Sequence, residues 1–234
     1  MGAERRPGDR GRRIRDGLSR RAPEATAGFV HAALERAVRG GGPLDSAATV
    51  ARKALDAGGD RDALGVLDAA VTQVIETHVR LAGAQGFATN VGGLVTMAVT
   101  VPSNVAGLAL VQCRMVAAVL HLRGYDLDDP RVRNAILATL LGEEKVLALV
   151  DRVKLPGTPM ALATAPVHDP HVNAVVAAEV ATELLTKVAG KRLATTVGRR
   201  VPVVGGLVGA GTDGFATWQV GRYADREFLA RRRR

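Results

Sequence analysis

The chain has 234 residues, of which 47% are hydrophobic but only 3% aromatic, and its formal net charge is +9. This length suits a single medium-sized domain with a substantial core. A core built mainly from Ala, Val and Leu favours closely packed helices over a sandwich or barrel, whose strands prefer aromatic and β-branched residues. The composition therefore predicts an all-α, multi-helix domain.

The positive charge is concentrated at the two ends of the chain. Residues 1–21 carry eight arginines against three acidic residues, and residues 231–234 are all arginine, so the body between them is neutral. Such tails bind anionic lipid or nucleic acid through charge alone, although charge runs are as often simply solvated. The scarcity of aromatic residues and the lack of a basic recognition helix argue against a specific nucleic-acid site.

The N-terminal part is predicted to change from disorder to helix near Pro23. Residues 1–22 combine Gly, Arg and Pro with almost no apolar periodicity, and they lack the apolar region of a secretory signal. Beyond them, apolar spacing and glycine stops predict helices over about 29–39, 45–57 and 60–81. The expected organisation is a tail over 1–22, a helical domain over 23–229 and a basic tail over 230–234.

A long uncharged segment follows. Residues 81–113 contain 33 residues without one charge, interrupted by Pro102, Ser103 and Asn104. The apolar runs on either side, 94–101 and 105–111, are too short to cross a bilayer, which takes about 20 residues. The segment is therefore expected to form a helical hairpin that is either buried core or dips into a membrane. Ser103 or Asn104 is expected to cap a new helix, which runs to about residue 122 and is closed by Gly124.

The second half of the chain is predicted to be helical as well. Asp129-Pro130 and Asp169-Pro170 each supply a cap followed by a first-turn proline, which predicts helices over 131–141 and from 170 to about 197. Another helix is expected over 143–153, a proline-rich loop over 154–168, and a last helix over 214–229. A basic patch, expected to contact an anionic surface, lies on or after the fourth of these segments: Lys187, Lys191, Arg192, Arg199 and Arg200.

No motif predicts a reaction, a cofactor or a metal. Gly209, Gly211 and Gly214 spell a dinucleotide fingerprint, but too little chain follows for the second strand of that fold, so close helix packing is the preferred interpretation. His168 and His171 lack further ligands, and a surface turn is expected there. The acidic residues around Asp126 lack the glycine and distal glutamate of a calcium loop. Cys113, the only cysteine, is expected to be buried and inert, and its isolation fits a reducing compartment.

One charged pair is predicted from the ends of the uncharged runs. Arg114 and Asp213 each border such a run. If the runs pack together, both charges leave water, and a buried charge without a partner is costly. We therefore expect these two side chains to lie close together, the alternative being that each sits in water at a helix end.

Several short blocks, taken in order, resemble the EcsC family. The central block contains Gly92-Gly93, Pro102-Ser103-Asn104, Gln112 to Ala117 with Arg114, and Gly124-Tyr125-Asp126. The C-terminal block runs from residue 201 to Asp213 and includes Pro202, Gly205, Gly206 and Gly209. The resemblance covers about residues 64–229 and implies a bacterial α-helical protein without an established reaction. It also implies membrane association and an ABC-transporter neighbour, because the family is named after a gene beside the two components of such a transporter.

Two functions remain open at this stage. The first is a non-enzymatic helical protein at the cytoplasmic face of a membrane, accessory to a transport system, whose partner is an anionic lipid surface or a membrane protein. The hairpin around Pro102 would supply its apolar contact and the basic segments its charge. The second is a soluble interaction module in which the uncharged segment is simply core. An enzyme is the least favoured class, since no catalytic constellation is present.

Overall fold

The computed structural model describes residues 28–58, 63–91, 97–197 and 202–231; only the backbone is described at 63–64, 86–91, 97–106, 185, 187–197 and 202–210. Within these ranges every regular element is a helix, which confirms the predicted all-α fold. The predicted disordered tail over 1–22 lies outside the described residues. A first helix covers residues 28–39, and the others are α2 (Ala47–Asp56), α3 (Ala63–Val91), α4 (Met97–Leu122), α5 (Pro130–Thr139), α6 (Glu143–Asp151), α7 (Pro159–Thr164), α8 (Pro170–Val197) and α9 (Pro202–Glu227).

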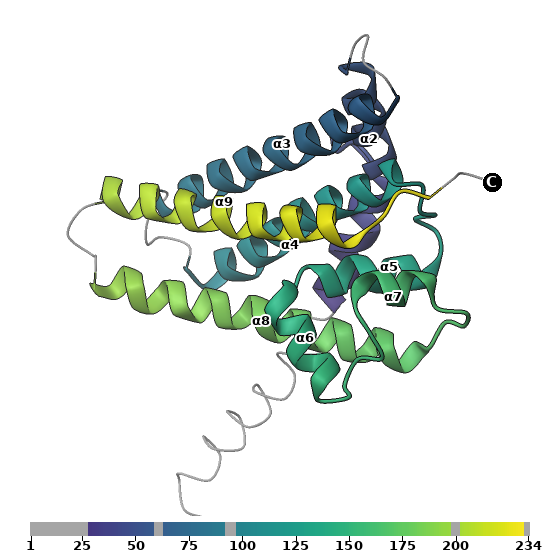
Figure 1. Ribbon diagram of the computed structural model, residues 1–234. Coiled ribbons are helices and arrows are strands. Elements are labelled where there is room, and N and C mark those ends of the chain that lie inside the picture. Colours follow the sequence, from purple (N-terminus) through teal and green to yellow (C-terminus); the bar gives the residue numbers. More distant parts are fainter. Residues whose placement is uncertain (1–27, 59–62, 92–96, 198–201, 232–234) are drawn as a thin grey trace, which may run out of the picture.

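Three long helices, α3, α4 and α9, pack against one another and form the centre of the molecule. Figure 1 shows α3 and α9 side by side, α8 along the opposite side, and α5 to α7 gathered near the C-terminal end of α9. Helix α4 also contacts α2, α5 and α8, so it touches elements from every part of the fold. Its position explains why its sequence is almost uniformly apolar.

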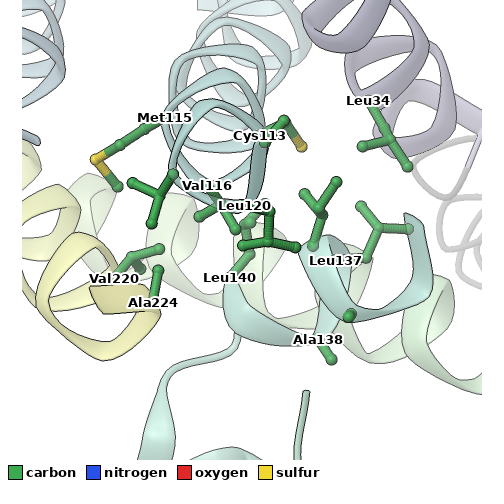
Figure 2. Packing of buried hydrophobic residues seen from close by; sticks show 14 of the residues in the cluster. Leu34, Cys113, Met115, Val116, Leu120, Leu137, Ala138, Leu140, Val220 and Ala224 are labelled. Atoms are coloured by element: carbon green, nitrogen blue, oxygen red, sulfur yellow. The ribbon is translucent and has the colours of Figure 1, made fainter. Parts of the chain in front are cut away.

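The core is built around the second half of α4. Met115, Val116 and Leu120 are fully buried and face Val220 and Ala224 of α9 on one side (Figure 2). On the other side they meet Leu137, Ala138 and Leu140 of α5, with Leu34 of the first helix nearby. Each fully buried side chain of this size stabilises the fold by about 1.5–3 kcal/mol.

Two of the predicted helix starts are confirmed by their caps. Asp129 accepts a hydrogen bond from the backbone N–H of Arg131, and Pro130 occupies the first turn of α5. Asp169 accepts one from the N–H of His171 at the start of α8. For α2 the start is one residue later than expected, because Ser46 is the cap, while the carboxylate of Asp45 pairs with Lys53 at 2.7 Å.

Three sequence-based expectations about helix limits are wrong. Helix α4 begins at Met97, so Pro102 and Asn104 lie inside a helix and not at its start. Helix α7 forms within the expected loop, starting at a first-turn proline, Pro159. Helix α9 starts at Pro202, so the glycine-rich block is helical too. In α4 and α9 the local preference of proline and glycine is overridden by packing against α3.

Candidate functional site

The family-like residues Gly124 and Tyr125 form the turn where the C-terminal segment docks. Gly124 closes α4 with a φ of 85°, and the N–H of Tyr125 donates to the carbonyl of Leu120 at 3.0 Å. The N–H of Arg231 donates to the carbonyl of Arg123 at 2.7 Å. A Cβ at position 124 would lie 2.6 Å from the carbonyl oxygen of Arg231. Glycine is therefore required here twice, once by the left-handed backbone and once by the close approach.

Tyr125 completes this docking site. Its ring is buried, meets Phe228 edge-on at 5.4 Å, and lies beneath the guanidinium of Arg231 at 5.3 Å. Burial raises the pKa of the Tyr125 hydroxyl. Beside it, Arg123 pairs with Asp225 of α9 at 2.7 Å. The start of the C-terminal tail, predicted to be a free basic end from residue 230, is thus fixed on the molecule at Arg231.

A groove of about 920 Å³ lies next to this turn, between the first helix, α2 and the α4–α5 loop. Its charged groups largely satisfy one another: Arg133 donates to Glu35 at 2.8 Å and to the carbonyl of Leu127 at 3.1 Å, and Asp126 accepts from the N–H of Asp128 at 3.0 Å. The lining residues are Val38, Arg39, Ala48, His121, Gly124, Tyr125, Asp126, Leu127, Asp128 and Arg133. This mixture of paired charges does not define a ligand class.

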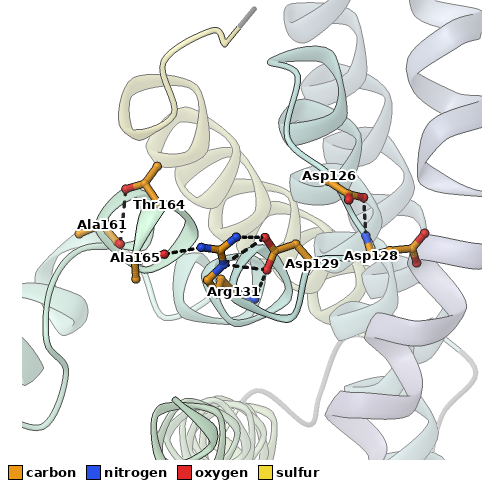
Figure 3. A network of polar contacts seen from close by, with 7 residues as sticks. All are labelled: Asp126, Asp128, Asp129, Arg131, Ala161, Thr164 and Ala165. Carbon is orange, nitrogen blue, oxygen red and sulfur yellow. Dashed lines mark hydrogen bonds and ion pairs between the residues drawn. The ribbon is translucent and has the colours of Figure 1, made fainter. Parts of the chain in front are cut away.

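A polar network holds the loop after the groove (Figure 3). Arg131 pairs with Asp129 at 2.6 Å and also donates to the carbonyl of Ala165, just after α7. The hydrogen bond from Arg131 lowers the pKa of Asp129. Within the described residues no group of three or more His, Cys, Asp or Glu side chains is arranged to hold a metal ion. The network therefore positions a turn and α7, and it offers no catalytic geometry.

Arg114 lies at the centre of a second polar contact, between α3 and α4. Its Nε donates to Nε2 of His78 at 3.1 Å, and Nδ1 of His78 donates to the carbonyl of Val74 at 2.7 Å. Burial, with a smaller effect of the Arg114 charge, lowers the pKa of His78 to about 4, so the ring is neutral. Burial lowers the pKa of Arg114 and the charge of Asp45 raises it. Arg114 is thus hydrogen-bonded to His78, and not to Asp213 as expected.

Helix α9 supplies the close packing that its glycines predict, although not at the expected positions. Gly209, Gly211 and Gly214 are turns of one helix and not a strand-to-helix loop. A Cβ at Gly221 would lie 2.8 Å from Cγ2 of Ile75, so α3 and α9 touch backbone to side chain there. The side chains at Gly205, Gly206 and Gly209 are outside the described ones. One turn earlier than Gly221, Thr217 accepts a hydrogen bond from the buried amide of Gln112 at 3.3 Å.

The opposite end of this helix group carries no charge on three of its four helix ends. Gly107 of α4 lies against Gln85 of α3, and Gly214 of α9 lies against Val79 and Gly83 of α3. The three helices therefore run past these contacts to a common end, formed by residues 86–91, 97–106 and 202–210, and α8 reaches the same end (Figure 1). None of these three stretches contains Asp, Glu, Lys, Arg or His. We call them the uncharged end.

An aromatic pair is exposed on α9 above the uncharged end. Phe215 and Trp218 stack with ring centroids 5.8 Å apart, and 59% of Phe215 and 47% of Trp218 remain exposed. The spacing of three residues puts both on one face of a helix, which the sequence could have revealed, but the pair was missed. Asp213, just before it, is buried.

The predicted basic patch is only partly covered by the description. Lys187, Lys191 and Arg192 lie on the last turns of α8, where only the backbone is described, and Arg199 and Arg200 lie outside the described residues. By chain order they belong to the segment that leads from α8 into α9, at the uncharged end. Cys113 is buried as predicted, and burial raises the pKa of its thiol to about 12.

This all-helical arrangement, with its family-like turn and glycine-rich last helix, fits the class of proteins that the sequence resembles. The model of the EcsC protein family matches residues 11–232. The chain therefore belongs to the EcsC family. The match starts well before residue 64, so the resemblance extends further into the N-terminal part than the sequence blocks indicated. No curated protein and no solved structure matches the chain.

Proposed function

We propose that this protein is a non-enzymatic helical protein that attaches to the cytoplasmic face of a membrane through its uncharged end. The observation that carries the proposal is the convergence of three helix ends without charge on one end of the molecule. They extend 6, 10 and 9 residues beyond the last described contacts, which at about 1.5 Å per residue is a projection of roughly 9–15 Å. That length suits one leaflet, since the hydrocarbon core is about 30 Å thick.

Peripheral attachment is consistent with the helices themselves. Among the described residues, no helix is both long enough and apolar enough to cross a bilayer. Membrane contact would therefore be made by helix tips and not by a spanning segment. Apolar insertion combined with a basic stretch is sufficient for reversible attachment.

The basic segment between α8 and α9 would supply the second signal. Lys187, Lys191 and Arg192 precede the connection from α8 to Pro202, and Arg199 and Arg200 are part of it. A basic residue at an anionic surface contributes about 1 kcal/mol to binding. The C-terminal arginines would not take part, because Arg231 docks beside Gly124 at the other end of α9. The 26 residues of α9 separate the two ends by about 39 Å.

Co-sedimentation with anionic and neutral vesicles across a salt series tests this proposal. We expect the full chain to bind anionic vesicles, and we expect Leu207→Glu, in the uncharged end of α9, to reduce binding strongly because a carboxylate resists leaving water. Replacing Lys187, Lys191 and Arg192 with Ala should make binding weaker and less dependent on salt. Leu147→Glu, at an exposed position of α6, and removal of residues 232–234 are matched controls that should bind normally. An absence of binding by the full chain would refute the proposal.

A soluble interaction module is the alternative, and one observation favours it. The described part of the uncharged segment, from Gly107 to Cys113, is buried or half-buried between α3 and α9. That part is core, so the apolar contact surface is limited to the helix tips. If vesicle binding fails, the same tips would be the surface on which to seek a protein partner.

A further inference from the structure

We infer that Leu81, Phe215 and Trp218 form a collar that sits at the level of the lipid headgroups when the molecule stands end-on in one leaflet of an anionic membrane. This inference rests on the proposed function and adds to it an orientation, a depth and the residues that set them. Three observations lead to it: the height of the collar, the position of the exposed charges, and the basic end of α8.

The three side chains lie at a similar height along the helices. Gly214 packs against the backbone of α3 between Val79 and Gly83, which places Phe215 level with Leu81. Trp218 is less than one turn further along α9 and stacks on Phe215. Leu81 is 41% exposed, so three large apolar side chains face outward at one level. The chain contains one tryptophan and four phenylalanines in all, which makes this gathering distinctive.

The collar also marks where exposed charge begins. Just above it, Arg80 pairs with Glu76 on α3 at 3.0 Å, and Arg222 pairs with Asp225 on α9 at 3.2 Å. Below it, α9 carries one charged residue, the buried Asp213, and α3 carries none after Arg80. Tryptophan prefers such a boundary, because its ring is apolar while its indole N–H needs a polar partner.

The depth agrees with one leaflet. From Pro202 to Phe215 α9 rises by 13 residues, or about 20 Å. Half of a bilayer, headgroups included, measures about 20–22 Å. With the helix tips near the middle of the bilayer, the collar falls among the headgroups. The basic residues of α8 and its connection reach the same end, and their charge complements an anionic lipid surface and not an apolar protein surface.

Trp218 makes the inference directly measurable, because it is the only tryptophan. The probe is a set of phosphatidylglycerol-containing vesicles with bromine atoms on the lipid chains at shallow or deep positions. The unmodified protein reports on position 218. Leu207→Trp in a Trp218→Phe background reports on the tip of α9, and Leu147→Trp in the same background reports on an exposed site of α6. Helix α6 begins beside the far end of α9, where Glu143 pairs with Arg226 at 2.7 Å.

We expect Trp218 emission to shift to shorter wavelength on binding and to be quenched most by shallow bromines. The tip reporter should be quenched most by deep bromines, and the α6 reporter by neither. Equal depth at positions 218 and 207 would mean that α9 lies flat on the membrane and would overturn the collar. Co-sedimentation without any change at Trp218 would also overturn it while leaving the proposed attachment intact. Failure to co-sediment would instead remove the proposed function itself.

Discussion

The two ends of the α3, α4 and α9 group differ in how they are held together. Toward the C-terminal ends of α4 and α9, polar pairs connect the helices: His78 with Arg114, Gln112 with Thr217, and Arg123 with Asp225. At the other end the same helices continue for 6 to 10 residues without a charge. One end thus specifies which helices pair and in what register, while the other offers apolar surface with little to fix it.

The contrast indicates a division of work along the helices. A buried polar pair is costly unless it is satisfied, so it tolerates only one arrangement of the elements that carry it. Apolar tips carry no such constraint. We therefore expect substitutions at the polar end to change the free energy of unfolding, and substitutions at the uncharged end to change attachment while leaving the fold intact.

The largest expected effect concerns His78. Its pKa is about 4 in the folded protein against 6.5 for an ordinary histidine, mainly because it is buried. Between these pH values the unfolded chain binds one more proton than the folded one, so stability is full above about pH 6.5 and decreases as the pH falls to 4. A difference of this size corresponds to about 3 kcal/mol. Urea unfolding from pH 7 to pH 4 should show this loss.

His78→Gln should remove most of that pH dependence, since a neutral amide has no proton to gain, and it should be less stable than the original at pH 7. His31→Gln, at an exposed position of the first helix, is the matched control and should retain the slope. An unchanged slope in His78→Gln would mean that other groups control acid stability, and the contrast between the two ends would lose its main support.

The next effect concerns how closely α9 approaches α3. Gly221→Ala would place a methyl group 2.8 Å from Cγ2 of Ile75 and 3.2 Å from Sδ of Met115, so we expect a loss of about 1–3 kcal/mol. Gly214→Ala is the control on the same face. Its methyl would meet Val79 at an ordinary 3.6 Å, and the higher helix propensity of alanine should stabilise the protein by up to about 1 kcal/mol. Chemical denaturation of both variants tests this, and similar losses would show that the approach is uniform along α9.

The sequence was sufficient for the fold class and for those boundaries that depend on local chemistry. Asp129-Pro130 and Asp169-Pro170 start helices because cap and proline act within a few residues. Pro102 was misread because its local effect opposes a helix of 26 residues that packs on α3 along its length. The glycines after Pro202 were misread for the same reason, since the partner that stabilises their helix lies more than a hundred residues away.

The site was less predictable because its contacts join distant parts of the chain. The expected partner of Arg114 was a charge at the border of another apolar run, Asp213. The actual partner is a neutral histidine 36 residues earlier, whose register against α4 no local pattern reveals. The exposed Phe215 and Trp218 were visible as a pair on one helix face, but nothing in the sequence indicated that this face would remain uncovered.

The smallest expected effect tests whether the C-terminal segment belongs to the polar end. Gly124→Ala should cost about 1–2 kcal/mol, partly from the left-handed backbone and partly from contact with the carbonyl of Arg231 at 2.6 Å. In a chain ending at residue 230 only the backbone part remains, so the two changes should couple by about 0.5 kcal/mol or more in a double-mutant cycle. Strict additivity would mean that Arg231 adds nothing to the fold. Vesicle binding should be the same in all four proteins, because this turn lies about 39 Å from the uncharged end.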